Sequence, residues 1–127
     1  MSRFMLAMKT QLSPVNGIST YVFDEIDAGI SGQTAKVVGE KFAQIAKNVQ
    51  IIAVSHLAQI AVMSDSEFLI KKYETDGKTY TAVHSLDKKE QISEIVRLLG
   101  GSDGDEFAIK HAEELLKQAK EYKNSIN

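Results

Sequence analysis

The sequence predicts a single α/β domain with a parallel βαβ core, a β-hairpin at its edge and two C-terminal helices. Two short apolar runs, Ile18–Phe23 and Val49–Val54, are separated by one amphipathic segment, which is the pattern of a βαβ unit. Asp76–Gly77 gives a hairpin turn signal, and two further amphipathic segments come after it. The chain has 127 residues, of which 43% are hydrophobic and 25% charged, as in an ordinary globular domain.

The first half of the chain carries the predicted parallel core. Ile18–Phe23 is rich in β-branched and aromatic residues, which is typical of a buried strand. Gln33–Lys47 has one apolar stripe at helical spacing, formed by Ala35, Val38, Phe42 and Ile45. Val49–Val54 is almost continuously apolar, as expected of a parallel strand covered on both faces. Gly39 lies inside the predicted helix, and we attribute it to a close approach of that helix to the sheet.

The second half predicts a hairpin and two helices. The expected strands are Phe68–Tyr73 and Thr79–Leu86. Asp87 is a predicted N-cap, with Glu90 three residues later in the capping-box position. That helix is expected to end at two glycines, and a last helix is expected from Glu106 to about residue 122.

Composition excludes several classes of function. The 15 Lys and Arg residues against 17 Asp and Glu residues argue against a strongly basic nucleic-acid binder, although they leave a local basic patch open. The absence of cysteine excludes disulfides, thiolate metal sites and cysteine nucleophiles. No apolar run approaches the length of a membrane span, so we expect no membrane partner and a cytoplasmic location. His84 and His111 have no evident partner in the sequence. Five cationic residues could contact DNA phosphates, but a solvated face is the interpretation that we favour: Arg3, Lys71, Lys72, Lys88 and Lys89.

The most informative feature is the acidic pair directly after the first predicted strand. Asp24 and Glu25 come immediately after Phe23, which places them at the carboxyl edge of the sheet, where α/β folds bind ligands. Successive side chains of an extended chain point in different directions. One carboxylate can therefore hold a cation while the other faces a water molecule, a division of roles that phosphoryl transfer requires.

A histidine occupies the corresponding position after the second predicted strand. His56 comes directly after Ser55 at the end of the apolar run, so neighbouring parallel strands would bring it to the edge that carries Asp24. There the imidazole could donate a hydrogen bond to a terminal phosphate or hold the attacking water. The loop Asp27–Gly32 has two glycines and a serine, which suit a tight backbone with exposed N–H groups. Asp27 could equally cap the turn before the next helix, and Ser31 the helix itself.

Segments across the chain also resemble a known family. They are VFDEIDAGISG (residues 22–32), VSHLAQIA (54–61), EIVRLLGG (94–101) and HAEELL (111–116), and SRFMLA (2–7) resembles the residues that come after a signature LSGGE segment. Together they resemble the C-terminal half of an ATP-binding-cassette ATPase head, in particular that of the RecN family of bacterial DNA repair proteins, which is related to the SMC proteins.

The resemblance implies a role for each matching residue. Asp24 corresponds to the Walker B acid that supports Mg²⁺, and Glu25 to the catalytic carboxylate that activates water. His56 corresponds to the switch histidine that senses the γ-phosphate. The D-loop, which communicates across a dimer of heads, would supply further cofactor-binding residues: Asp27, Gly29, Ser31 and Gly32.

The sequence also departs from the family pattern. It has no GxxxxGK[ST] phosphate loop, no signature glycines before Ser2 and no long heptad run. We therefore expect residues 1–127 to form one domain, the C-terminal lobe of the head of a longer protein, without the Walker A lobe and the coiled coil. This lobe alone should neither bind ATP tightly nor hydrolyse it.

The full protein is expected to use ATP and Mg²⁺ in DNA double-strand break repair and to associate with the nucleoid. Its expected partners are the N-terminal Walker A lobe, a second head in a homodimer, and DNA. Two other classes stay open. The chain could be a stand-alone metal-dependent phosphohydrolase or nuclease that uses Asp24, Glu25, Asp27 and His56, or a non-catalytic module that docks through an apolar surface.

Overall fold

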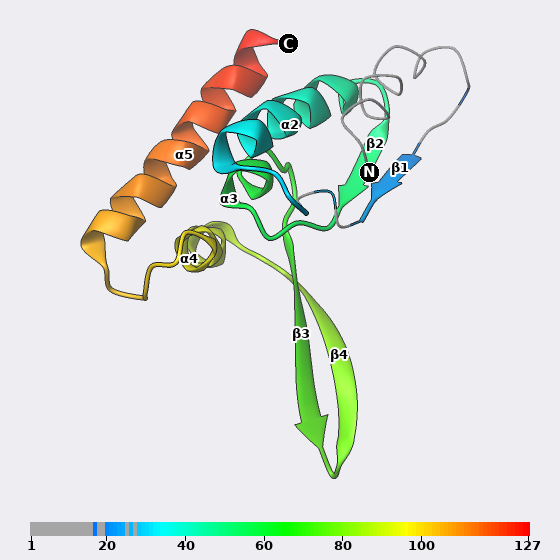
Figure 1. Ribbon diagram of the computed structural model, residues 1–127, viewed down its shortest axis with the longest axis vertical. Coiled ribbons are helices and arrows are strands. Elements are labelled where there is room, and N and C mark those ends of the chain that lie inside the picture. Colours follow the sequence, from blue (N-terminus) through cyan, green and yellow to red (C-terminus); the bar gives the residue numbers. More distant parts are fainter. Residues whose placement is uncertain (1–16, 18–19, 25, 27) are drawn as a thin grey trace.

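The structure of the protein is a computed structural model, which describes residues 17, 20–24, 26 and 28–127. Figure 1 shows a body of helices and one short sheet, from which a long hairpin extends. The elements, in chain order, are β1 (Thr20–Phe23), α2 (Gly32–Ile45), β2 (Gln50–Ala53), α3 (Ala58–Ala61), β3 (Phe68–Thr75), β4 (Lys78–Ser85), α4 (Lys88–Leu98) and α5 (Glu106–Ser125). The predicted mixed α/β fold is confirmed.

The first core lies between the β1–β2 sheet and α2. The two strands pair in parallel, with Thr20 opposite Gln50 and Phe23 opposite Ala53. Phe23 is fully buried, and its ring lies 4.7 Å from that of Phe42 on α2, measured between centroids. The sheet–helix core, as we call this cluster, consists of Tyr21, Phe23, Ile26, Ala35, Val38, Phe42, Ile45 and Ile60. A strand, a helix and a parallel strand therefore form the unit that the sequence predicts.

The opposite face of this sheet has no cover among the described residues, which differs from the expectation that the second strand is covered on both faces. Val22 and Ile52 are opposite each other in the register and are 63% and 48% exposed. The apolar run Val49–Val54 has the composition of a strand buried on both faces, but in this chain α2 packs on one face of the sheet only. The strand therefore has an apolar face for which the described part of the chain provides no cover.

Gly39 marks the closest approach of α2 to another element, and that element is α3. A Cβ atom added to Gly39 would lie 2.9 Å from the carbonyl oxygen of Gln59 and 3.1 Å from Cγ of Met63. The predicted close approach is therefore present, but its partner is a short helix rather than the sheet. With only four residues, α3 has no counterpart among the elements predicted from the sequence.

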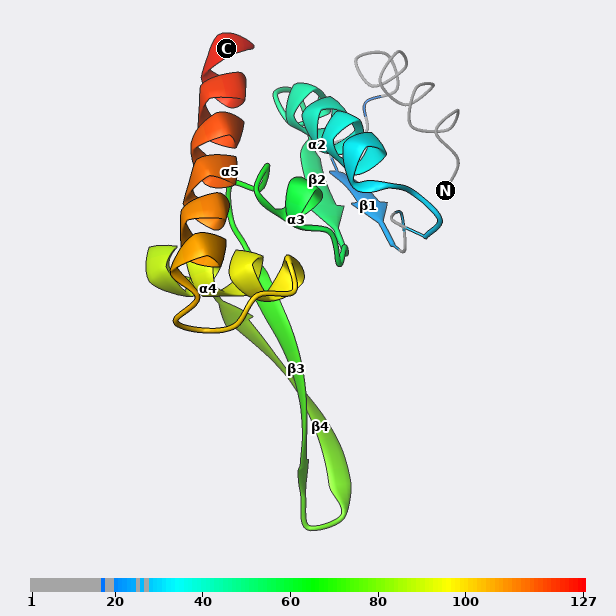
Figure 2. The same cartoon turned by 60° about the vertical axis from the view of Figure 1, so that its left-hand side comes forward.

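The hairpin forms a sheet of its own. Thr75 pairs with Lys78 across a two-residue turn, in which Asp76 and Gly77 have φ values of 51° and 71°. Positive φ at both positions is the geometry of a type I′ turn, which matches the twist of the two strands. Each strand has eight residues. Within the described residues the hairpin shares no strand pairing with β1 or β2, so it extends from the body rather than continuing the parallel sheet (Figures 1 and 2).

Local capping fixes where the two C-terminal helices begin. The Asp87 carboxylate accepts a hydrogen bond from the Glu90 N–H (2.8 Å), and the Glu90 carboxylate accepts one from the Asp87 N–H (2.9 Å). This is the predicted capping box. Asp105 caps α5 by accepting hydrogen bonds from the N–H groups of Phe107 and Ala108.

α5 closes a second core against α3 and α4. The buried members of this helical core are Ala58, Val62, Ile95, Val96, Ala112 and Ala119. α5 runs to Ser125, beyond its predicted end near residue 122. Lys123, in this extra turn, donates hydrogen bonds to the carbonyl oxygen of Ser64 and to the Asp65 carboxylate, both at 3.1 Å. These contacts tie the end of the helix to the segment after α3.

Candidate functional site

The parallel register brings Asp24 and His56 to the same edge of the sheet. Phe23 is opposite Ala53, and the N–H of Val54 donates to the carbonyl oxygen of Phe23 (2.9 Å). Asp24 is the next residue after β1, and His56 comes two residues after Val54. Both side chains are exposed. The structure therefore places the acid and the imidazole at the carboxyl edge of one strand pair, as the sequence predicts.

The backbone around His56 is held on both sides. The Leu57 N–H donates to Oγ of Ser55 (3.1 Å), which closes a turn around the histidine. Leu57 packs against the sheet–helix core, and Ala58 is buried in the helical core. His56 thus occupies a short link between the two cores, so its position depends on the packing of both.

The loop before α2 lies against the same link. Gly29 has φ = 74°, which is the left-handed region that favours glycine. Ser31 is the N-cap of α2, and its Oγ accepts a hydrogen bond from the Thr34 N–H (3.4 Å), so its capping role is confirmed. A Cβ atom added to Gly32 would lie 3.4 Å from Nε2 of Gln59. The start of α2 therefore lies close to α3, the helix that begins two residues after His56.

Glu25 and Asp27 lie outside the described residues. The structure brings together the edge residues Asp24 and His56 and describes Gly29, Ser31 and Gly32 in the adjoining loop. An exposed carboxylate such as that of Asp24 is a hard oxygen ligand of the kind that Mg²⁺ prefers, so its chemistry fits this ion. Among the described residues, no group of three or more His, Cys, Asp or Glu side chains could hold a metal. Asp24 would therefore act with ligands from outside that set.

Two side-chain relationships were not predicted from the sequence. The side chain of Gln59 on α3 lies close to Gly32 at the start of α2. The one feature of the sequence that could have pointed to Gln59 is its position three residues after His56. His84 also has a partner: its Nε2 lies 3.0 Å from Oε1 of Glu90, on the side of the molecule that carries the hairpin. A backbone hydrogen bond from Asp87, together with the contact with His84, lowers the pKa of Glu90.

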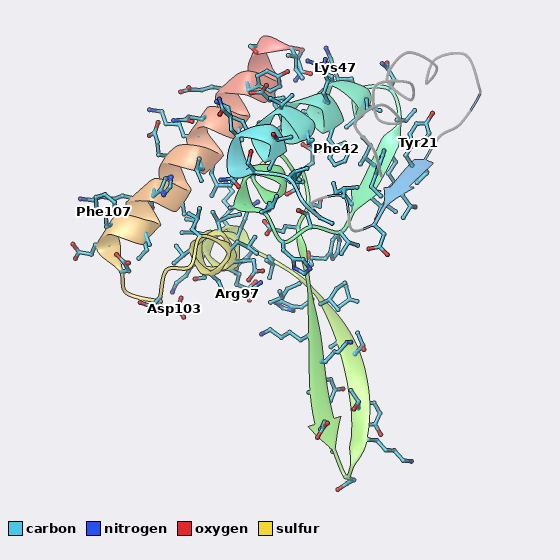
Figure 3. The ribbon with its side chains drawn as sticks, viewed as in Figure 1. Tyr21, Phe42, Lys47, Arg97, Asp103 and Phe107 are labelled. Carbon is cyan, nitrogen blue, oxygen red and sulfur yellow. The ribbon has the colours of Figure 1, made fainter. Side chains whose placement is uncertain are left out.

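A cavity of about 1130 Å³ lies beside the open sheet. Its wall includes Ile52 and Val54 of the β2 segment, Phe68 and Ile70 of β3, and His56. Apolar side chains from two separate sheets therefore face a common space next to the candidate site. Figure 3 shows Phe42 pointing from α2 toward the parallel strands, which is the covered face, and Phe107 pointing from α5 away from the body.

A search of solved structures identifies the class of fold. The chain is similar to one solved in a study of ATP-driven dimerization and DNA-stimulated activation of SMC ATPases. The TM-score is 0.56 and the sequence identity 21%, over 82% of this chain and 65% of the other. No family model matches the sequence. The chain has the fold of this SMC ATPase chain over most of its length.

Curated relatives of this sequence belong to one group of proteins. Each of three carries the name DNA repair protein RecN. The protein of Bacillus subtilis is 38% identical over 98% of this chain. Those of Halalkalibacterium halodurans and Deinococcus radiodurans are each 40% identical over 91% of it. The chain spans about a fifth of the length of these relatives (20–22%). It is a homologue of one segment of the RecN proteins, which confirms the family resemblance in its sequence.

The described helices give no sign of a membrane span, since none of them is long and apolar enough to cross a bilayer.

Proposed function

We propose that this chain is the C-terminal lobe of an ATPase head of the SMC and RecN type. In the complete protein the head would bind and hydrolyse ATP with Mg²⁺ during DNA double-strand break repair, in the nucleoid of the cytoplasm. The observation that carries the proposal is the parallel register of β1 and β2, because it puts Asp24 and His56 at one edge. Homology to the RecN proteins supports the same assignment.

Each residue at this edge has a distinct chemical task in the proposal. The Asp24 carboxylate, exposed just after β1, holds Mg²⁺. The ion neutralises phosphate oxygens when it is bound. The Glu25 carboxylate accepts a proton from the attacking water, as a general base. His56 donates a hydrogen bond from its imidazole to an oxygen of the terminal phosphate.

The loop before α2 would join this edge to a second head. In the proposal Asp27, Gly29, Ser31 and Gly32 take part in the nucleotide site across a homodimer. The Ser31 cap fixes the end of the loop on α2, and the start of α2 at Gly32 lies close to Gln59 of α3. α3 begins two residues after His56. In the proposal, a displacement of the loop and the start of α2 would therefore shift α3 and change the position of His56.

The open face of the sheet supports docking onto the N-terminal Walker A lobe of the same protein. Val22 and Ile52 are exposed on that face, and the cavity beside it has further apolar walls. Large exposed apolar surfaces usually mark places where another surface binds. Docking would cover this face of the sheet and supply the phosphate loop that the sequence does not contain, so we expect DNA-coupled ATP turnover only in the complete protein.

The sharpest test is Glu25→Gln in the complete protein. Loss of the general base should slow ATP hydrolysis by at least about 10²-fold while nucleotide binding is retained. The matched control is Glu74→Gln on the hairpin, which removes an exposed carboxylate far along the chain and should leave turnover unchanged. Unchanged turnover in Glu25→Gln would remove this residue from the mechanism and would favour a lobe that only docks.

A second test separates the histidine from the acid. His56→Ala in the complete protein should reduce turnover more than nucleotide binding, whereas His111→Ala on the exposed side of α5 should reduce neither. A His56→Ala protein of normal rate contradicts the switch assignment.

The third test uses the 127-residue chain alone. Calorimetry with Mg-ATP should detect weak binding or none. A micromolar dissociation constant, or hydrolysis of phosphate esters or DNA by this chain with Mg²⁺, would instead support a self-sufficient metal-dependent enzyme.

A further inference from the structure

The hairpin presents two faces of different chemistry. Side chains alternate along a strand, and residues that pair across an antiparallel ladder share a face. By the register, Lys71 pairs with Ala82, Tyr73 with Tyr80, and Thr75 with Lys78. We call the face with these residues the tyrosine face; its members are Leu69, Lys71, Tyr73, Thr75, Lys78, Tyr80, Ala82 and His84. The opposite face carries Phe68, Ile70, Lys72, Glu74, Thr79, Thr81, Val83 and Ser85.

Two aromatic rings lie at the centre of the tyrosine face. The centroids of Tyr73 and Tyr80 are 5.5 Å apart and the ring planes differ by 20°, so the rings stack across the strands. The two residues are 50% and 45% exposed. Their pairing stabilises the hairpin, and it also leaves flat aromatic surface open to solvent on an element that projects from the body (Figure 1).

Positive charge flanks these rings on both sides. Lys71 is two residues from Tyr73 along β3, and Lys78 is two residues from Tyr80 along β4, which is about 7 Å in each case. The tyrosine face carries no acidic side chain. Glu74 lies on the opposite face and Asp76 lies in the turn. At the base of the hairpin Glu90 is paired with His84 and its negative charge also interacts with Lys71, so the cation furthest from an acid of α4 is Lys78, toward the tip.

We propose that the tyrosine face binds single-stranded nucleic acid. Bases would stack on the rings of Tyr73 and Tyr80, while the ammonium groups of Lys71 and Lys78 contact flanking phosphates. Aromatic rings bordered by cations are the means by which proteins hold single strands without sequence preference. In a duplex the bases already stack on one another, so the exposed rings would contribute little there.

The opposite face of the hairpin differs in chemistry from the tyrosine face, which supports separate roles for the two faces. Its exposed Phe68, Ile70 and Val83 suit a protein surface, and they leave the cationic tyrosine face free of that contact. The chain as a whole has a formal charge of −2, so the interaction depends on the arrangement of a few cations and not on net charge. The inference deepens the DNA part of the proposed function, on which it rests for its biological setting, but it shares no residue with the candidate ATP site.

The test is fluorescence anisotropy of a labelled oligothymidylate of about 15 nucleotides with the whole chain, at low salt and without ATP. Replacing both rings (Tyr73→Leu with Tyr80→Leu) should weaken binding at least about fivefold, the lower end of the effect of one lost base stack. The double change to phenylalanine keeps the ring faces and should retain binding. A duplex of the same length should bind more weakly than the single strand.

The chain offers a matched pair of lysines for the second arm. Lys71→Gln removes a cation from the tyrosine face, and Lys72→Gln removes the same charge from the opposite face. Lys71→Gln should weaken binding and reduce the slope of log affinity against log salt by about 0.7, the value for one phosphate contact on a single strand. Lys72→Gln should change neither.

Several results would overturn the proposal. They are no binding of the oligonucleotide, equal losses from Lys71→Gln and Lys72→Gln, equal losses from leucine and phenylalanine at positions 73 and 80, and duplex binding as tight as single-strand binding. If the leucine variant loses the circular dichroism spectrum of the folded chain, the phenylalanine and lysine arms still decide. Because ATP is absent, failure here is distinct from failure of the ATPase proposal, which Glu25→Gln tests.

Discussion

The two hydrophobic cores of this molecule are built differently. The sheet–helix core depends on aromatic rings: Phe23 lies between Tyr21 and Phe42, at centroid distances of 6.3 Å and 4.7 Å. The helical core depends on small residues such as Ala112 and Ala119, which let α5 approach its neighbours closely. The sheet–helix core leaves an apolar sheet face open and carries the candidate site at its edge. The half of the chain that carries the candidate site is therefore also the half with an exposed apolar sheet face.

The largest expected effect is loss of the central ring of the sheet–helix core. Phe23→Ala should lower the free energy of unfolding by about 3–5 kcal/mol, because it removes a fully buried aromatic side chain and leaves a cavity. A two-stranded sheet has little stability of its own, so the strand pairing depends on this packing. Urea unfolding followed by circular dichroism measures the change.

The control for Phe23 is a phenylalanine on the helical half. Phe107 is 84% exposed, so Phe107→Ala should change the free energy of unfolding by no more than about 0.5 kcal/mol. Similar losses of unfolding free energy at Phe23 and Phe107 would contradict the burial of Phe23 and the exposure of Phe107.

The next effect compares close approach in the two cores. At Gly39 an added Cβ would lie 2.9 Å from the backbone oxygen of Gln59, and at Gly101 it would lie 2.7 Å from Cβ of Ala108. Each glycine-to-alanine change should destabilise the chain by about 1–3 kcal/mol through overpacking. At Gly39 alanine also regains about 1 kcal/mol of helix propensity, so the net loss should be smaller there. Equilibrium unfolding of both variants measures the difference, and a more stable Gly39→Ala protein would contradict the α2–α3 contact.

Features that depend on neighbours in the sequence could be predicted from it. The capping box at Asp87 and Glu90 needs only residues three apart, and the Asp76–Gly77 turn needs only two residues that tolerate positive φ. The shared edge of Asp24 and His56 was also predictable, because parallel strands joined by one helix present the same ends together.

Features that depend on contacts between residues distant in the sequence could not be predicted from it. α3 is too short to show an apolar period, so the partner of Gly39 and the contact between Gln59 and Gly32 were hidden. The predicted cover on the second face of the second strand is absent from the described residues for another reason. An apolar strand indicates that both of its faces are buried in the complete structure. The element that covers the second face need not belong to the same segment of the protein.

A smaller effect is expected at the start of α4. Asp87→Ala removes the acceptor for the Glu90 N–H and should cost about 1 kcal/mol of unfolding free energy. Asp87→Asn keeps a capping oxygen and should cost much less. Asp103→Ala, which removes an exposed acid from the loop before α5, serves as the control in the same thermal or urea unfolding experiment. Equal losses from alanine and asparagine at position 87 would argue that the cap contributes nothing to stability.

The smallest effect concerns a half-buried acid beside α4. Burial raises the pKa of Glu67 above its ordinary value of 4.5, the negative charge of Glu94 raises it further, and a hydrogen bond from Gln91 opposes the shift. Its Oε2 is buried with no hydrogen-bond partner among the described residues. Because the pKa is higher in the folded state, the proton stabilises the fold below pH 4.5, and this contribution is lost as the pH rises through the folded-state pKa.

Glu67→Gln imitates the protonated acid without titrating. The variant should therefore be more stable than the original chain at pH 7, by no more than about 1 kcal/mol since the group is partly solvated. The two proteins should converge at about pH 4. The control is Glu113→Gln on the exposed side of α5, which should show no such convergence. Urea midpoints at the two pH values measure the effect, and a Glu67→Gln protein that is less stable at pH 7 would mean that the carboxylate forms a favourable contact on the helical side of the molecule.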